Sequence, residues 1–164
     1  MIDQQHQAKP YATRAENRRA FWSLGALFDI KAAGTDTRNH FSLSEAVMTK
    51  LAEPPLHVHH GEDEAWYVLD GKLTFHVGDQ VFEALPGTFV FAPKDIPHRF
   101  SVDVEPTRVL VITSPGGGFE KVVEEGGLAL ERSQGPVPPD LEKLMELGEK
   151  YHFEILGPPI TALP

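Results

Sequence analysis

Several features that would each point to a particular class of protein are missing from this sequence. It contains no cysteine, so it can form neither a disulfide framework nor a thiolate metal site. It has no apolar run of the length of a membrane span, and its first ten residues lack the apolar segment of a secretory signal. These absences favour a reducing compartment, and we expect a cytoplasmic protein that does not bind membranes.

Positive charge is also scarce. There are 15 Lys and Arg residues against 24 Asp and Glu, which gives a formal net charge of -9. This balance argues against nucleic acid or an anionic membrane surface as a partner. The glycine-rich stretch at residues 114–118 is followed by neither of the common phosphate-loop patterns. We therefore do not expect a phosphorylated or highly charged substrate.

What the sequence does contain is a series of short segments in which apolar and polar residues alternate. In one of them Ala26, Phe28 and Ile30 share a face, and in another Phe41, Leu43 and Val47 do. Turn signals separate the segments, at Asp70-Gly71, Gly78-Asp79, the acidic stretch 102–106 and Pro86-Gly87. The pattern predicts an all-β domain, most simply a jelly-roll barrel.

The length of 164 residues fits one such domain. We expect an N-terminal arm at residues 1–20, the barrel at 21–113 and a helical extension at 114–164 that packs on the barrel. Two helices are predicted in the extension from their apolar spacing. One carries Phe119, Val122 and Val123, and the other carries Leu141, Leu144, Met145 and Gly148 on one side. We expect them to cap the barrel or to form a dimer interface rather than to act as a lid.

The candidate chemistry lies in the stretch from Pro54 to Gly71. Read as a strand, His57 and His59 point to the same face, where two imidazoles can reach one metal ion. Glu64 opens the returning strand and can face the same interior, although sequence parity does not exclude Glu62. His98 is the fourth candidate, far downstream. Three imidazoles and one carboxylate leave two positions free on an octahedral ion, enough for a substrate and a co-reactant.

These residues resemble the two motifs of the cupin superfamily. The spacing from His57 and His59 through Glu64 to Gly71 is similar to the first motif, and Gly78, Pro86-Gly87 and His98 are similar to the second. The resemblance implies a double-stranded β-helix barrel and one divalent transition metal ion (Mn, Fe, Co, Ni or Zn). By the same resemblance His57, His59, Glu64 and His98 are the metal ligands, and Glu64 is also the candidate general base.

Within the superfamily the chain resembles the small quercetinase-like monocupins, through the runs around residues 34–47 and 54–71 and through the tail segments G-G-F-E-K-V-V and I-L-G-P-P. That implies a dioxygenase that acts on a small aromatic or enolisable phenolic substrate. Two other classes stay open: a non-redox metal-dependent cyclase, isomerase or lyase, and a non-catalytic cupin that binds a small ligand.

Strand parity also predicts what surrounds the metal. Trp66 and Val68 face inward with Glu64, Phe100 accompanies His98, and Phe75 lies on a neighbouring inward face. These residues are candidates for an apolar substrate pocket, and an equally weighted alternative is that they are ordinary barrel core. We also expect a homodimer, built through the strands at Ala26–Ile30 and Phe41–Val47.

Overall fold

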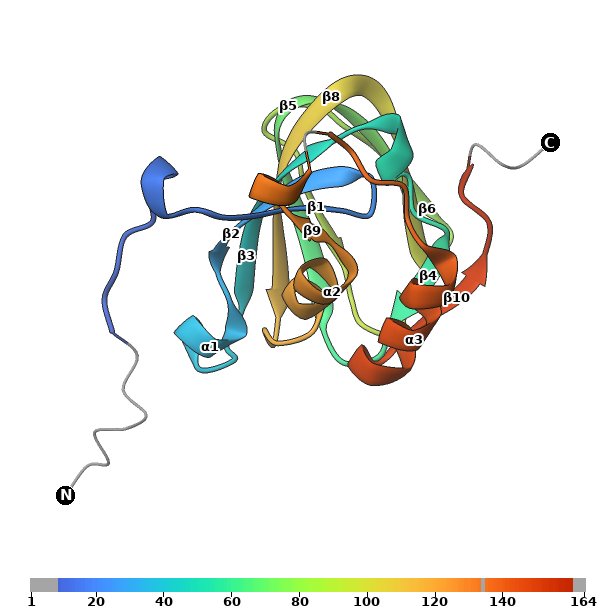
Figure 1. Ribbon diagram of the computed structural model, residues 1–164. Coiled ribbons are helices and arrows are strands. Elements are labelled where there is room, and N and C mark those ends of the chain that lie inside the picture. Colours follow the sequence, from blue (N-terminus) through green and yellow to red (C-terminus); the bar gives the residue numbers. More distant parts are fainter. Residues whose placement is uncertain (1–8, 134, 161–164) are drawn as a thin grey trace.

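The alternating segments of the sequence form antiparallel strands that wrap into a barrel, with two helices along one flank (Figure 1). The structure is a computed structural model and describes residues 9–133 and 135–160. The first eight residues of the expected N-terminal arm and the last four of the expected extension lie outside the described residues. The predicted all-β barrel with C-terminal helices is confirmed.

The strands are β1 (Arg19–Ser23), β2 (Ala26–Ala32), β3 (Ser42–Met48), β4 (Leu56–His59), β5 (Asp63–Val77), β6 (Gln80–Ala84), β7 (Phe89–Ala92), β8 (His98–Ser114), β9 (Leu128–Ala129) and β10 (Phe153–Gly157). The helices are α1 (Gly34–Thr37), α2 (Phe119–Gly126) and α3 (Leu141–Tyr151), with short 3₁₀ turns η2 (Ala15–Asn17), η3 (Lys50–Ala52) and η4 (Leu130–Arg132). Among these helices none is long and apolar enough to cross a bilayer.

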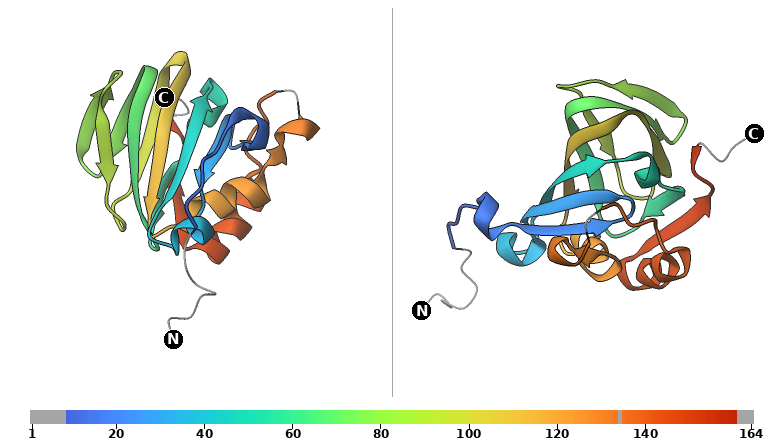
Figure 2. Two further views of the ribbon diagram at one scale, coloured as in Figure 1. Left: turned by 90° about the vertical axis from the view of Figure 1, so that its left-hand side faces the viewer. Right: turned by 45° about the horizontal axis from the view of Figure 1, so that its top comes forward.

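The two long strands β5 and β8 connect both layers of the barrel. In the first layer, the N-terminal half of β5 pairs with the C-terminal half of β8, and these two lie between β7 and β3. This layer continues from β3 through β2 and β1 to β9. In the second layer, the C-terminal half of β5 pairs with the N-terminal half of β8, and these two lie between β6 and β4. Strand β10 completes this layer by pairing with β4. Figure 2 shows how the two layers wrap around a common interior.

The inward residues of both layers fill one apolar core. It includes Phe28, Ile30, Leu73, Val102 and Val109, all of which are buried. Alternation therefore reports the buried face correctly in β2 and in the second half of β5. In β3 the inward face is formed by small and flexible residues, while Leu43 and Val47 lie half-buried on the outside.

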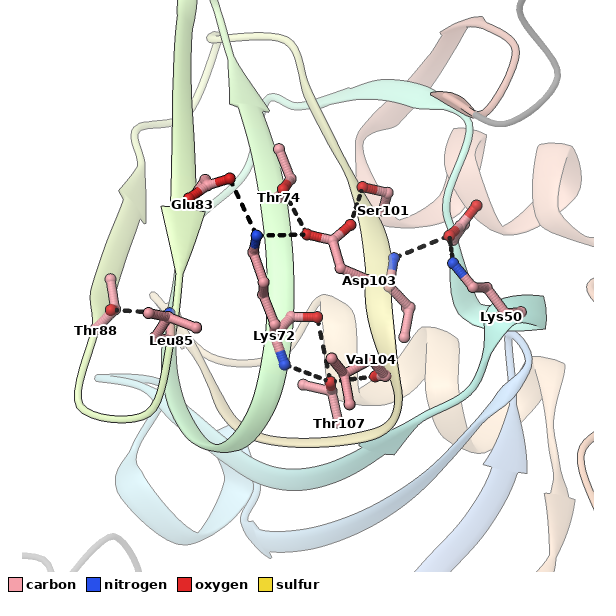
Figure 3. Close-up of polar contacts among 12 residues, drawn as sticks. Lys50, Lys72, Thr74, Glu83, Leu85, Thr88, Ser101, Asp103, Val104 and Thr107 are labelled. Carbon is pink, nitrogen blue, oxygen red and sulfur yellow. Dashed lines mark hydrogen bonds and ion pairs between the residues drawn. The ribbon is translucent and has the colours of Figure 1, made fainter.

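Two of the turns predicted from sequence are bends within continuous strands. β5 runs through Asp70-Gly71 and β8 runs through residues 102–106, so the prediction of separate strands at these places is wrong. Gly71 has a φ of +87°, and a Cβ there would overlap Thr107 on β8. The Thr107 hydroxyl accepts a hydrogen bond from the Lys72 backbone N–H at 3.0 Å and donates to the Val104 carbonyl at 2.6 Å (Figure 3). Glycine thus lets β5 bend without leaving the sheet.

The predicted Gly78-Asp79 hairpin is confirmed, because Val77 pairs with Gln80 across a two-residue turn. Polar side chains join the strands on the solvent side of this region. Lys72 contacts Glu83 at 3.0 Å and Asp103 at 3.9 Å, and Thr74 donates to Asp103 at 2.7 Å (Figure 3). These contacts hold the C-terminal half of β5 and the N-terminal half of β8 beside β6.

The segment after residue 114 contributes strands as well as helices. α2 and α3 lie side by side on the flank away from β6, and β9 and β10 extend the two layers (Figure 2). A small second core joins Val122 of α2 to Leu144 and Leu147 of α3. The predicted inward face of α3 is partly wrong: Met145 and Leu141 are exposed, and Leu147 takes the buried position. The boundaries at residues 20 and 113 stay predictions.

Candidate metal centre

Three imidazoles and one carboxylate from three strands converge at one place in the barrel. His57 and His59 come from β4, Glu64 begins β5, and His98 begins β8. His57 lies directly opposite His98 in the β4–β8 pair, which brings residues 41 positions apart in sequence into contact. One ligand atom from each of the four side chains lies within 4.8 Å of all the others.

Glu64 stands at the centre of this cluster. Its Oε2 atom lies 3.3 Å from Nε2 of His59 and 3.2 Å from Nε2 of His98. In His57 and His98 the second ring nitrogen, Nδ1, faces a backbone carbonyl. Nδ1 of His57 lies 2.8 Å from the Pro55 carbonyl, and Nδ1 of His98 lies 3.0 Å from the Ile96 carbonyl. Their Nε2 atoms are therefore the ones available to an ion.

The donor set fits a first-row divalent ion. Neighbouring ligands on one ion with bonds of about 2.0–2.2 Å lie about 3 Å apart, close to the separations seen around Glu64. Nitrogen and carboxylate oxygen donors suit Mn, Fe, Co, Ni and Zn. The four residues expected from sequence are thus brought together, and the cluster has the composition of a mononuclear metal site.

The ionisation of the cluster follows from burial and from its close charges. Burial, together with the neighbouring His98 and His59, lowers the pKa of His57 to about 3. Burial also acts to lower the pKa of His59, but the carboxylates of Glu62 and Glu64 outweigh it and raise that pKa to about 9. Burial acts to raise the pKa of Glu64, and hydrogen bonds from His59 and His98 overcome it and hold the pKa well below its usual range. An ionised Glu64 is what a cation requires.

An apolar wall alone would raise the pKa of Glu64 and would favour its use as a general base. The apolar wall is present, but two imidazoles lie within hydrogen-bonding distance of the carboxylate and dominate its surroundings. The structure therefore favours Glu64 as a metal ligand. Its role as a general base stays a prediction.

Glu62, the alternative that sequence parity left open, lies on the other side of the His59 ring. Its Oε1 atom is 3.4 Å from Nδ1 of His59, whereas Glu64 contacts Nε2 of the same ring. Glu62 is only 3% exposed, and it is not one of the four converging side chains. Burial raises its pKa above the usual value.

An apolar cavity opens beside the cluster, and His57, His59 and Glu64 form part of its wall. Two of the predicted pocket residues, Trp66 and Phe100, also line it. The other two, Val68 and Phe75, are fully buried in the barrel core behind them, with the Trp66 and Phe75 rings 4.8 Å apart. Among the described residues that line this cavity there is no Lys or Arg.

Much of the cavity wall comes from the C-terminal segment, which sequence reasoning treated as a cap. The contributing residues are Phe119, Val122, Pro139, Leu144, Phe153 and Ile155. Strand β10 pairs with β4 so that Phe153 lies opposite His59 and Ile155 opposite His57. The alternation Phe153-Glu154-Ile155 is a strand signal that the sequence interpretation missed.

One further acidic residue lines the cavity. Glu53 is buried, and its Oε1 atom accepts a hydrogen bond from the Val102 backbone N–H at 2.9 Å and contacts Lys50 Nζ at 3.4 Å. Its carboxylate is thus committed to holding η3 against β8. The polar chemistry open to a ligand in this cavity is that of the histidine and Glu64 cluster.

Comparison with known proteins agrees with this fold and site. Residues 45–113 match the Cupin domain family, and this segment contains all four residues of the cluster. Two curated relatives are an uncharacterized protein of Streptomyces coelicolor, 34% identical over 56 residues, and one of Methanocaldococcus jannaschii, 27% identical over 75 residues. The matches cover 34% and 45% of this chain and 53% and 60% of the relatives, so the chain spans little more than half of their length.

Solved structures share the fold at low sequence identity. KdgF from Halomonas sp. superposes with a TM-score of 0.57 at 19% identity, covering 66% of this chain and 96% of its own. Pac13, described as a nucleoside dehydratase, gives 0.56 at 9% identity, with 79% and 95% covered. Fe(II) HppE gives 0.54 at 13% identity, with 65% and 62% covered. The family match and the shared fold support the cupin superfamily, with a cupin-type β-barrel and a His/Glu cluster suited to a metal ion.

Proposed function

We propose that this protein is a mononuclear-metal cupin enzyme, most closely a quercetinase-like dioxygenase of a small aromatic or enolisable phenolic substrate. In this proposal His57, His59, Glu64 and His98 hold one divalent transition metal ion. The observation that carries the proposal is the convergence of these four side chains at the edge of an apolar cavity. A ligand site with an apolar wall and a few converging polar groups is the usual form of a small-molecule pocket.

The cavity wall supports the choice of substrate class. A ligand that enters it meets aromatic and aliphatic side chains on all described sides, with the metal-binding cluster as its polar end. A phosphate or a second carboxylate held against the apolar wall would find no Lys or Arg among the described lining residues and would lose its hydration without compensation there. A flat phenol or diketone, with oxygen atoms at one end and an apolar body, matches this distribution.

The chain's own residues would act mainly by positioning and by excluding water. Trp66 and Phe100 contact the apolar body of the substrate from the barrel side, and Phe153 and Ile155 do so from β10. Glu64 is the group in reach of a proton on a substrate hydroxyl beside the cluster. A bound divalent ion would supply a Lewis acid for the substrate anion and, if redox-active, a means of electron exchange with molecular oxygen.

The proposal is tested by metal analysis followed by a reaction screen. The untagged protein is analysed for bound elements and then loaded separately with Mn, Fe, Co, Ni and Zn. Oxygen consumption is measured with a panel of flavonols and diketones. We expect about one ion per chain and oxygen uptake with a redox-capable ion. Turnover with Zn under anaerobic conditions would select the non-redox enzyme instead, and tight ligand binding without any turnover would select a binding protein.

We further propose that the protein is a homodimer. The outer face of β8, β5 and β7 carries a row of apolar residues, in which Tyr67 lies beside both Leu110 and Phe89. Tyr67, Phe89 and Phe91 are 39%, 59% and 49% exposed. A second copy of the chain presents the same apolar face, so that a two-fold contact buries both at once. This face differs from the one expected from sequence, which used the strands at residues 26–30 and 41–47. In the first of these, Ala26, Phe28 and Ile30 face the barrel core, and in the second Leu43 and Val47 are half-buried.

A further inference from the structure

The three imidazoles of the cluster differ in what lies behind them. His57 and His98 each have their Nδ1 atom within hydrogen-bonding distance of a backbone carbonyl. Among the described residues the Nδ1 atom of His59 has no such carbonyl; it is buried without a hydrogen-bond partner there and faces the Glu62 carboxylate at 3.4 Å. Of the three, His59 is the one whose ring is flanked by a carboxylate on each side.

Glu62 is placed with unusual tightness for a charged side chain. It is 3% exposed, and its Oε2 atom is buried with no hydrogen-bond partner in the part of the chain that the structure describes. The carboxylate lies against Gly118, the residue that caps the N-terminus of α2, where an added Cβ would come within 2.7 to 2.9 Å of its atoms. A buried carboxylate without full hydrogen bonding is costly, so its retention calls for a partner that benefits from it.

We propose that Glu62 is a positioning residue for the metal centre: it holds the Nδ1–H of His59 and so leaves Nε2 free for the ion. This inference rests on the proposed metal site. Histidine ligands of metal ions commonly donate their other N–H to a carboxylate or carbonyl, which fixes the tautomer and makes the ligand more basic. Here two ligands use carbonyls and the third uses a carboxylate.

The position of Gly118 extends the proposal to the C-terminal cover. α2 begins against the Glu62 carboxylate, and its first turn carries Phe119 and Val122 into the cavity wall. A shift of the helix N-terminus would therefore move the Glu62 carboxylate, and with it the orientation of the His59 ring. In this arrangement the Glu62 side chain links the start of α2, which forms part of the cavity wall, to His59, which holds the metal.

The test measures Co(II) binding and the visible absorption spectrum of the Co(II) protein. Glu62→Gln keeps the size and an acceptor oxygen but removes the charge, and Glu62→Leu removes both. Glu120→Gln is the matched control, because Glu120 is also a buried carboxylate close to Gly118 in sequence, but it accepts a hydrogen bond from the Gly34 backbone N–H and is not one of the four converging side chains. We expect affinity to fall in the order wild type, Gln, Leu, with the Leu variant about 10- to 100-fold weaker and its spectrum altered.

Two further results separate the alternatives. Gly118→Ala retains the carboxylate but displaces it, and we expect it to weaken Co(II) binding and to change the spectrum in the same direction as Glu62→Gln. A folded Glu62→Leu protein that binds Co(II) as tightly as wild type, with the same spectrum, would overturn the positioning role. Wild-type protein that binds no Co(II) would instead refute the proposed metal site itself.

Discussion

Phe153 of β10 lies directly across the sheet from His59 of β4, with the centres of the two rings 5.8 Å apart. A residue near the end of the chain is thus a neighbour of a candidate metal ligand in the middle of it. The same pairing places Ile155 opposite His57. Because strand side chains alternate, the residues between and after them, Glu154 and Leu156, point away from the cavity.

The first prediction is that Phe153 and Ile155 contribute to substrate affinity. Phe153→Ala and Ile155→Ala each remove apolar contact from the cavity wall, and we expect flavonol binding to the metal-loaded protein to weaken by about 5- to 30-fold, which corresponds to about 1–2 kcal/mol. Leu156→Ala is the control, since Leu156 lies on the same strand but is 45% exposed. Absorbance titration measures the affinity. Equal weakening by all three variants would show that β10 acts only through stability.

Packing of the C-terminal cover gives a second prediction. Leu147 is 1% exposed between α2 and the barrel, whereas Met145, two residues earlier on α3, is 60% exposed. Leu147→Ala is expected to lower the free energy of unfolding by about 2–5 kcal/mol, because it leaves a cavity in the second core. Met145→Ala is expected to change it by less than about 0.5 kcal/mol. Urea denaturation followed by circular dichroism compares the two; a larger loss for Met145→Ala would contradict the arrangement.

Sequence reasoning reached the barrel and three residues of the cluster because these depend on local patterns, whereas the distant His98 was assigned through its similarity to the second cupin motif. Alternation gives the buried face of a strand, and the spacing of His57, His59 and Glu64 follows from a strand, a short connection and a returning strand. It failed at Gly71, where a turn signal proved to be a bend, because the decisive contact is with Thr107 on another strand. The pairing of β10 with β4 is likewise a contact between distant segments that no local pattern encodes.

The outer apolar face gives a third prediction, on assembly. Phe89→Lys places a charge in the middle of the proposed interface, and we expect it to convert a dimer into a monomer at micromolar concentration. Val81→Lys is the control, because Val81 is 60% exposed on β6, outside this face. Light scattering coupled to size-exclusion chromatography measures the mass. A wild-type protein that is monomeric, or a Phe89→Lys protein that stays dimeric, would contradict this interface.

A fourth prediction concerns protons. At neutral pH the metal-free cluster carries a proton on His59, whose pKa is raised to about 9, and none on His57, whose pKa is lowered to about 3. A metal ion must displace the His59 proton, so affinity is expected to rise as the pH increases towards about 9, by up to tenfold per pH unit. Calorimetry at pH 7 in buffers of different ionisation enthalpy should show about one proton released per ion. Affinity that is independent of pH between about 6.5 and 8.5 would contradict this.

The same shift has a consequence for the stability of the metal-free protein. The folded pKa of His59 lies above the ordinary value of 6.5, so the protonated form is favoured by folding. This contribution is fully present below about pH 6.5 and is lost as the pH rises through about 9. Thermal unfolding of the metal-free protein across this range is expected to show a falling midpoint, which saturating metal should abolish.

The last prediction separates the two roles of Glu64. Glu64→Gln keeps the size and an oxygen donor but removes the charge and the basicity. If Glu64 accepts the substrate proton, the variant should retain measurable metal at saturating supply and yet lose about 100-fold or more of its turnover. His98→Ala removes a ligand that has no proposed part in proton transfer, so it should lose metal and activity together.

The structure makes this comparison sharp, because Glu64 and His98 are in direct contact at 3.2 Å and are both buried. A difference between the two variants in metal content or turnover therefore cannot be attributed to a difference in the location or solvent exposure of the two side chains. Metal content and turnover are measured on the same preparations. A Glu64→Gln enzyme with full metal and near-normal turnover would refute the base assignment and leave Glu64 as a ligand only. That result would agree with the lowered pKa of Glu64 and would mean that the substrate arrives already ionised.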